Sequence, residues 1–139
     1  MSKKEKDVDV AKIQARPAVY VAGKLNDDAV GYLTNVHNMM EWAEKVRRIG
    51  ASPFIPAIDL LMGIKFGYTN YHDYFDPSQS WLSKSDAIFV CPGWETSSGT
   101  KKEIELAESL EIEIFYDFGE LEDWVDNFRH SVMALWQGE

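Results

Sequence analysis

The segment "AIFVCPGWETSSGTKKEIELAESLEIEIFYD" (residues 87–117) decides the fold. It begins with an apolar strand, Ala87 to Cys91, and passes through a turn rich in Pro, Gly and Ser. A helix follows from Lys101 to Leu110, and residues 112–117 form a second apolar strand. Strands that alternate with helices are typical of a parallel sheet covered on both faces. Ligands bind at the carboxyl ends of such strands, so the turns after Gly23, Pro56 and Cys91 are expected to line one cleft.

The same pattern extends to both sides of this segment. "AVYVAG" (18–23) predicts a buried strand, "SPFIP" (52–56) a short second strand, and 57–85 one or two helices with a loop that partly covers a pocket. Helices are expected from the capping residues at 26–28 to Gly50 and from about Leu121 to Trp136. The first of these helices carries an apolar stripe at Val30, Leu33, Val36, Met40, Ala43 and Val46.

We therefore predict one α/β domain over residues 17–139, a flavodoxin-like or Rossmann-like three-layer sandwich. Its four or five parallel strands should follow the order 2-1-3-4, with right-handed crossovers. Residues 1–16 lack apolar periodicity and are expected to form a flexible charged tail.

Charge and composition exclude several classes of function. The formal charge is −9, and residues 17–139 carry −11 because the first 16 residues hold five Lys/Arg against three Asp/Glu. An acidic body disfavours nucleic acid as a partner but permits a small anion held by backbone amides. No apolar run approaches the ~20 residues of a membrane helix, and no signal peptide is evident, so we expect a cytoplasmic protein without membrane contact. The single cysteine, Cys91, and the absence of Cys/His ligand spacing predict neither a metal nor another cofactor.

Glu103 is the central candidate in the turn and helix after Cys91. On a helical wheel it lies in the middle of the apolar arc formed by Ile104, Leu106, Ala107 and Leu110. One interpretation is a capping box, because Thr100 and Glu103 have its spacing, and on spacing alone this role is the commoner one. The other is a reactive carboxylate at the sheet edge. Both hold if the helix begins earlier, at Ser97 or Ser98.

In that case Ser97, Ser98 and Gly99 resemble a phosphate cradle, with hydroxyl groups and unobstructed backbone amides at a helix start. The alternative is an ordinary turn with a helix cap. Cys91 lacks a neighbouring base and is expected to be a buried, inert thiol. Asp86 is expected to fix the start of its strand.

"VYVAGKL" (19–25) and "WLSKSDAIFVCPGWETSSGTKKEIELAESLEIEIF" (81–115), in this order, resemble the nucleoside 2-deoxyribosyltransferase superfamily. The similarity is to small phage and bacterial members and to nucleoside 5′-monophosphate N-glycosidases, and it covers about residues 18–117. It implies that Glu103 attacks or stabilises the anomeric carbon and that Ser97 binds a 5′-phosphate. Gly23, at the end of the first strand, is expected to line the same site.

The resemblance also implies an acid that protonates the departing base, eight residues before Asp86. That position is Ser78, which departs from the pattern, and Asp76 is the substitute we predict. A nucleobase needs aromatic faces, for which the candidates are Tyr71, Tyr74 and Trp81.

These residues predict cleavage of the N-glycosidic bond of a nucleotide or nucleoside, by hydrolysis or base exchange. Two alternatives remain open: a nucleotide-binding module that has lost turnover, favoured by Ser78, and an NAD-cleaving enzyme. We also expect at least a dimer, because the closing helix carries Trp124, Phe128 and Trp136 on one stripe.

Overall fold

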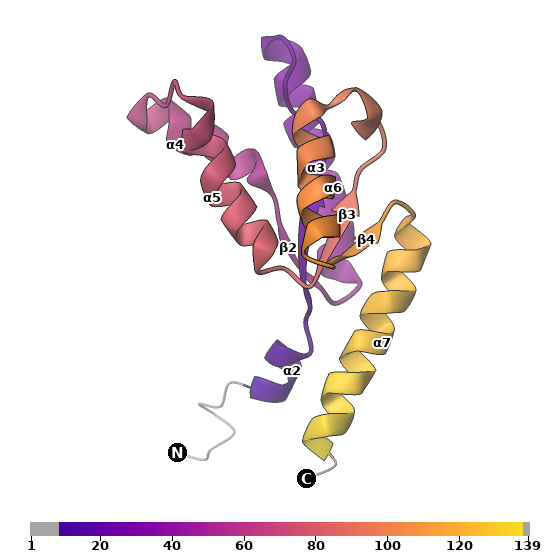
Figure 1. Ribbon diagram of the computed structural model, residues 1–139. Helices are drawn as coiled ribbons and strands as arrows, with labels where there is room; N and C mark the ends of the chain where they lie inside the picture. Colours follow the sequence, from indigo (N-terminus) through magenta and orange to yellow (C-terminus); the bar gives the residue numbers. More distant parts are fainter. Residues whose placement is uncertain (1–8, 138–139) are drawn as a thin grey trace.

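The computed structural model describes residues 9–137 and contains one four-stranded sheet (Figure 1). The strands are β1 (Ala18–Ala22), β2 (Ser52–Phe54), β3 (Ala87–Val90) and β4 (Glu113–Phe115). They pair in the order β2-β1-β3-β4, and every pairing is parallel. The predicted α/β class, parallel pairing and strand order are confirmed.

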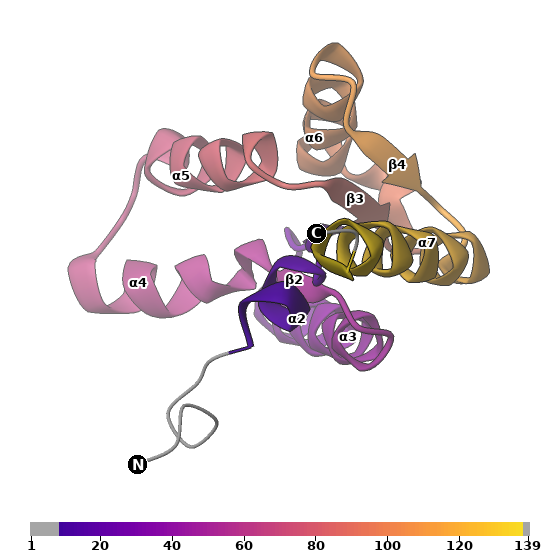
Figure 2. The same ribbon diagram turned by 90° about the horizontal axis from the view of Figure 1, so that it is seen from below.

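Helices cover both faces of the sheet, as Figure 2 shows from below. One face carries α3 (Ala29–Arg48) and α7 (Phe118–Gln137), and the other carries α5 (Tyr71–Ser83) and α6 (Ser98–Ser109). A 3₁₀ turn, Pro56–Ile58, and α4 (Asp59–Phe66) connect β2 to α5. Two helices therefore form between residues 57 and 85, as predicted.

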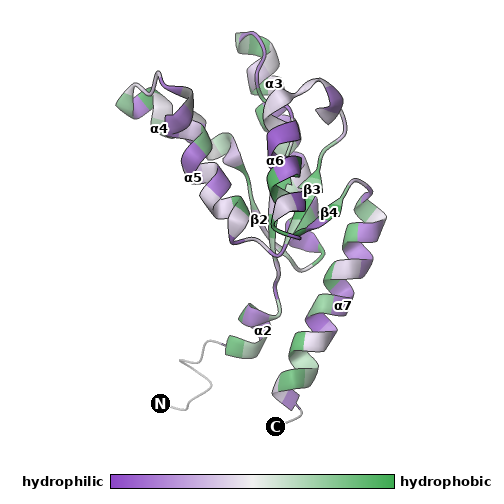
Figure 3. Ribbon diagram, in the orientation of Figure 1, coloured by the Kyte–Doolittle hydropathy of each residue, from purple (hydrophilic) through white to green (hydrophobic). Residues whose placement is uncertain are grey.

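Alternation along the central strands builds two separate cores. Val19, Val21 and Phe89 pack with α3 and α7, whereas Tyr20 and Ile88 pack with α5 and α6. The central strands are hydrophobic throughout, as Figure 3 shows for β3, because a sheet covered on both faces buries every residue. Tyr20 is thus a buried polar residue at the centre of the sheet.

The predicted apolar stripe of α3 is only partly buried. Ala43 and Val46 are in the core, whereas Val30 is 75% exposed and Leu33 and Met40 are about half exposed. The first turns of α3 project past the carboxyl edge of the sheet (Figure 1), so they have no strand to cover. The helical spacing predicted which side of α3 faces the sheet. It did not predict how many turns of α3 the sheet covers.

Some element boundaries differ from those predicted. Helix α6 begins at Ser98 rather than Lys101, which agrees with the earlier start that was considered at Ser97 or Ser98. Helix α7 begins at Phe118 rather than near Leu121. Asp86 accepts a hydrogen bond from the Ala18 amide at 2.8 Å and therefore does fix the start of the paired strands.

Part of the expected charged tail has regular structure. Residues Val10–Gln14 form the short helix α2, which Asp9 caps and which contacts α7. Ala15 is buried, and the Arg16 side chain donates a hydrogen bond to the Arg47 carbonyl oxygen at 3.2 Å. The contact of α2 with α7 could not be predicted from this segment, because its apolar content is low. Residues 1–8 of the expected tail lie outside the described residues.

Two glycines shape the carboxyl edge of the sheet. A Cβ atom on Gly23 would lie 3.2 Å from Cβ of Cys91, so glycine lets the ends of β1 and β3 approach closely. Gly93 has a φ of 90°, a left-handed conformation that favours glycine, and it reverses the chain after β3. Within residues 9–137, none of the helices has the length and apolar character needed to span a membrane.

Candidate functional site

A cavity of about 700 Å³ opens at the carboxyl edge of the sheet, lined by the start of α6, the α4–α5 segment, and the loop after β1 with the first turn of α3. Its volume falls in the usual range for small-molecule sites. Gly23, Pro56 and residues 96–99 all line it, so the three turns predicted to share one cleft do so. Pro92 to Glu95, the first part of the turn after β3, are not among its lining residues.

Glu103 lies in the wall of this cavity and is 7% exposed. It is the sixth residue of α6, and its neighbour Ile104 packs against the sheet. Burial raises the pKa of Glu103 to about 7, although a hydrogen bond from Tyr20 acts in the opposite direction. The prediction that Glu103 faces inward at the sheet edge is confirmed.

The capping-box interpretation of Glu103 is not what the structure contains. Ser97 is the N-cap of α6, and its Oγ accepts a hydrogen bond from the Thr100 amide at 3.2 Å. Thr100 therefore lies in the first turn rather than at the cap. The Glu103 carboxylate instead accepts a hydrogen bond through Oε2 from the Tyr20 hydroxyl group.

Tyr20 joins the central strand β1 to the carboxylate of α6, across 83 positions of sequence. It is fully buried, and burial, followed by the charge of Glu103, raises its pKa well above the usual value. The hydroxyl group therefore keeps its proton and donates a hydrogen bond to Glu103. A charge-assisted bond of this kind stabilises the ionised carboxylate in a dry environment.

A second carboxylate, Asp59, lines the same cavity from the start of α4. Its Oδ2 accepts a hydrogen bond from Ser78 Oγ of α5 at 2.9 Å, and Ser78 itself is 5% exposed. Burial raises the pKa of Asp59, and the bond from Ser78 partly offsets this rise. The charge of Asp59 also raises the pKa of Tyr20, whereas hydrogen bonding by Ser78 lowers it. Asp59, Ser78, Tyr20 and Glu103 thus form one interacting group.

The start of α6 forms part of the cavity wall. Ser97, Ser98 and Gly99 line the cavity, and the Ser97 hydroxyl oxygen accepts bonds from both the amide and the hydroxyl group of Thr100. That arrangement leaves the Ser97 hydroxyl hydrogen available as a donor. A Cβ atom on Gly99 would meet nothing within 4 Å, so the backbone there is open to a ligand.

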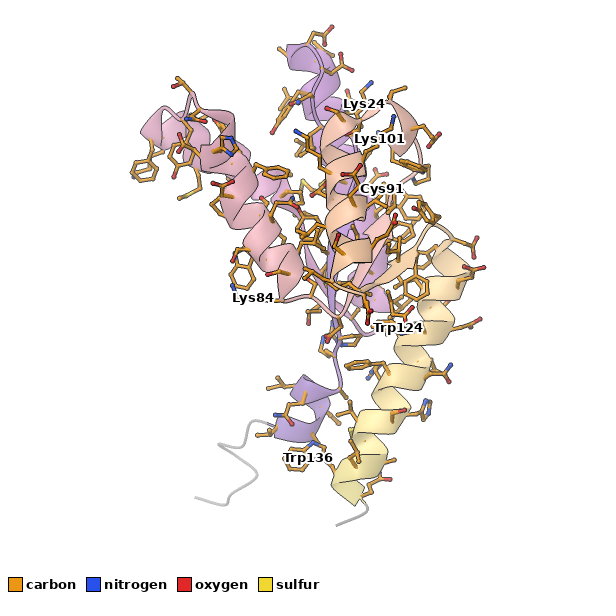
Figure 4. All side chains as sticks on the ribbon, viewed as in Figure 1. Lys24, Lys84, Cys91, Lys101, Trp124 and Trp136 are labelled. Carbon is orange, nitrogen blue, oxygen red and sulfur yellow. The ribbon has the colours of Figure 1, made fainter. Side chains whose placement is uncertain are left out.

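Lys24 adds a positive charge to the wall of the cavity. Figure 4 shows Lys24 and Lys101 at the end of the molecule where α6 begins, far from Lys84 and Trp124. A helix N-terminus carries a partial positive charge, and Lys24 lies on the same side of the sheet edge. The cavity lining therefore combines three acidic side chains, Glu103, Asp59 and Asp27, with a rim formed by Lys24 and the start of α6.

The comparison with protein families matches residues 17–116 to a family described as a domain of unknown function, DUF4406. The chain belongs to the DUF4406 family. This match begins one residue before β1 and ends one residue after β4, so the sheet and both carboxylates lie within the DUF4406 domain. Helices α2 and α7 lie outside it. No curated protein matches the chain.

Most of the predicted site residues meet in the DUF4406 cavity. Its lining includes the following of them: Glu103, Gly23, Ser97, Ser98, Gly99 and Tyr74. Tyr74 donates a hydrogen bond to the Tyr68 carbonyl oxygen at 2.8 Å, which holds its ring in place. Tyr71 begins α5, but its side chain lies outside the part of the chain that can be described.

Asp76 and Trp81 do not line the cavity. The cavity face of α5 carries Tyr74 and Ser78, and Asp76, two residues from each, faces away because a helix turns about 100° per residue. Asp76 is exposed and pairs with His72 at 3.2 Å. Trp81 is 56% exposed and stacks on Phe54 of β2 with ring centroids 5.5 Å apart.

Several lining residues were missed by sequence reasoning, namely Tyr20, Lys24, Tyr32, Asp59, Phe75 and Gln79. Asp59 follows the Pro56 turn at the end of β2, and this position at a strand end was the signal that could have identified it. Gln79 Oε1 is buried without a hydrogen-bond partner. An unsatisfied buried amide oxygen costs stability unless a ligand supplies a donor.

Other titratable groups of the DUF4406 domain are less suited to chemistry. Cys91 is buried, and burial raises the pKa of its thiol to about 12, so the reactive thiolate is scarce at neutral pH. Among residues 9–137, no three or more His, Cys, Asp and Glu side chains are grouped so as to hold a metal ion.

Proposed function

We propose that the protein cleaves the N-glycosidic bond of a nucleoside 5′-monophosphate, by hydrolysis or by transfer to a second base. The observation that carries this proposal is Glu103, a carboxylate buried against Tyr20 in the wall of a ligand-sized cavity. A carboxylate with a strongly raised pKa is costly in a folded protein, and such groups are concentrated at functional sites. A purely structural role would not require a cavity beside it.

The chemistry suits this arrangement. Breaking an N-glycosidic bond passes through a state with positive charge on the anomeric carbon and ring oxygen. Glu103 would trap or stabilise that charge, while the hydroxyl group of Tyr20 holds one of its oxygens, Oε2, and leaves Oε1 for the sugar.

The rim formed by Lys24 and the start of α6 supports a phosphorylated substrate. A 5′-phosphate would accept hydrogen bonds from the Ser97 hydroxyl group and from the amides of Ser98 and Gly99, with Lys24 nearby. The nucleobase would lie among the aromatic side chains of Tyr32, Tyr74 and Phe75 on the opposite wall. A nucleotide substrate also implies a cytoplasmic location.

The resemblance to the nucleoside 2-deoxyribosyltransferase superfamily supports the same assignments, because Glu103 and Ser97 occupy its reactive and phosphate-binding positions. It covers about the same residues as the DUF4406 match.

The direct test is to incubate the protein with a panel of ribo- and deoxyribonucleotides, the matching nucleosides and NAD, and to measure free base by chromatography. Release from a monophosphate supports the proposal, and release of nicotinamide from NAD supports the NAD-cleaving alternative. Tight binding of a nucleotide without any release favours the binding module, for which Ser78 at the usual acid position is the specific argument.

Ser97→Ala is expected to weaken the use of nucleoside monophosphates by roughly tenfold in KM, because a hydrogen bond to a charged phosphate is worth about 1.5 kcal/mol. The same variant should leave the KM of an unphosphorylated nucleoside nearly unchanged. Paired Michaelis–Menten measurements on a nucleoside and its monophosphate test this expectation.

Ser97 also caps α6, so the loss of the cap needs a control. Ser97→Asp keeps a good cap but places a carboxylate at the rim, and it should weaken monophosphate use further while preserving the melting temperature. Equal losses on nucleoside and nucleotide in the alanine variant would contradict the phosphate assignment.

We also propose that the protein associates into at least a dimer. On α7, Trp124 and Phe128 pack together and are half-buried, whereas Leu135 and Trp136 remain exposed. The larger apolar surface is on α4, where Leu61, Met62, Ile64 and Phe66 are all between 44% and 72% exposed. Sedimentation velocity at micromolar concentration should show a dimer or larger species, and Ile64→Glu should shift it toward monomer more than Leu135→Glu does. A monomeric wild type would refute association.

A further inference from the structure

The cavity contains a second carboxylate that no sequence pattern assigned. Asp59 begins α4, and its carboxylate is held by Ser78 of α5. Both residues line the same cavity as Tyr20 and Glu103. Cleavage of a glycosidic bond by a pair of carboxyl groups requires one to act at the anomeric carbon and the other to protonate the leaving group. Glu103 meets the first requirement under the function proposed above.

We propose that Asp59, positioned by Ser78, is the acid that protonates the departing base. This assignment rests on the proposed function and replaces Asp76, which is exposed and does not line the cavity. It also explains why a serine can stand where the resembling enzymes have an acid. The serine does not donate the proton itself, but its hydroxyl group orients a carboxylate that comes from a different helix.

The reaction balances with these two carboxyl groups and water. As the bond between C1′ and the base nitrogen breaks, its electron pair goes to the base, which takes the Asp59 proton, and C1′ forms a bond to Glu103. Water then attacks C1′, the ester bond to Glu103 breaks, and the Asp59 carboxylate accepts the proton that water loses. The products are the free base and the sugar phosphate, and both carboxyl groups return to their starting states.

The environment of Asp59 suits an acid that must also act as a base. It is partly buried, and burial raises its pKa from the ordinary value, which favours the protonated form. The bond from Ser78 favours the ionised form and limits that rise. Glu103 must be ionised while Asp59 is protonated, so the active fraction falls at both low and high pH.

The decisive experiment compares two leaving groups. One substrate is the unmodified nucleotide that the wild type cleaves fastest in the panel, and the other is 7-methylguanosine 5′-monophosphate, whose base is already positively charged and leaves without a proton. Asp59→Asn should lose about 10² to 10⁴-fold in kcat on the unmodified nucleotide and less than about tenfold on the methylated one. Glu103→Gln should lose activity on both.

The pH profile gives an independent readout. On the unmodified nucleotide, Asp59→Asn should lack the fall in rate at high pH that the wild type shows. Ser78→Ala removes a bond that stabilises ionised Asp59, so it should raise the pKa of Asp59 and move the low-pH side of the profile to higher pH. The high-pH side should stay in place, because Glu103, with a pKa of about 7, holds the last proton of the pair. A merely structural effect of Ser78 would lower the rate at every pH without moving either side of the pH profile. Melting temperatures of the variants show that each one folds.

The outcomes separate the two proposals. If Glu103→Gln is inactive but Asp59→Asn keeps full activity, or loses equally on both substrates, the assignment of Asp59 is overturned and the function stands. If the wild type releases no base from any substrate of the panel, the proposed function fails and the role of Asp59 fails with it.

Discussion

Glu103→Gln is expected to lower base release from a nucleoside monophosphate at least about a thousandfold, or ~4 kcal/mol of transition-state stabilisation. Glutamine has nearly the same size and still accepts the hydrogen bond from Tyr20, but it cannot carry the negative charge that an electron-poor anomeric carbon requires. The loss should appear in kcat, with nucleotide binding largely retained. Single-turnover rates and equilibrium binding on the same preparation measure the two effects separately.

Glu105 offers a matched control on the same helix, because it is exposed and does not line the cavity. Glu105→Gln removes the same charge from α6 and should change the rate by less than about twofold, since exposed charges are well screened. Full activity in the Glu103 variant would rule out its catalytic role and leave the cavity as a binding site.

Glu103→Gln is also expected to stabilise the folded protein at alkaline pH, by up to about 3 kcal/mol. The pKa of Glu103 is raised from 4.5 to about 7 in the folded state, so folding favours the protonated carboxyl group. Below the unfolded pKa the side chain is neutral in both states and carries no penalty. As pH rises through about 7, ionising the buried group costs stability, and the cost is complete above that value.

Chemical denaturation of the wild type and Glu103→Gln across this pH range measures the difference. The two proteins should be about equally stable at low pH and diverge with rising pH, with a final difference in the free energy of unfolding of up to about 3 kcal/mol. Glu105→Gln should follow the wild type throughout. If Glu103→Gln is instead less stable than the wild type at every pH, the carboxylate has a structural role and the inferred cost of ionising it is absent.

Much of the fold was predictable because local and long-range signals agree. The apolar strands at 18–23 and 87–91, the helix between Asp28 and Gly50, and the parallel order all follow from periodicity and from the crossover rule. The predictions of burial were wrong where a helix extends beyond the sheet. Val30, in the first turn of α3, and Leu135, near the end of α7, have helical apolar spacing but are exposed. These helix ends extend beyond the sheet (Figure 1), and spacing does not indicate where the sheet ends.

The site was predictable only in its linear part. Ser97 to Glu103 form a contiguous segment, and its helix start, its cap and its inward-facing glutamate can be predicted from the local sequence pattern. Asp59 and Tyr20 reach the cavity through tertiary structure, one from the helix after β2 and one from the centre of a strand that reads as purely structural. Asp76 lies close in sequence to Ser78, the position where the resemblance implies an acid, but the rotation of α5 turns it away from the cavity.

The positions of α2 and α7 bear on how the protein can be handled. Helix α2 and the C-terminal part of α7 lie at the end of the molecule opposite the cavity, in contact with each other, and Figure 4 shows Trp136 of α7 beside α2. A surface tether attached after α7 would therefore hold the molecule with its cavity directed away from the support. Fusion partners attached beyond α2 or α7 would start at this end of the molecule, away from the cavity that holds Tyr20 and Glu103.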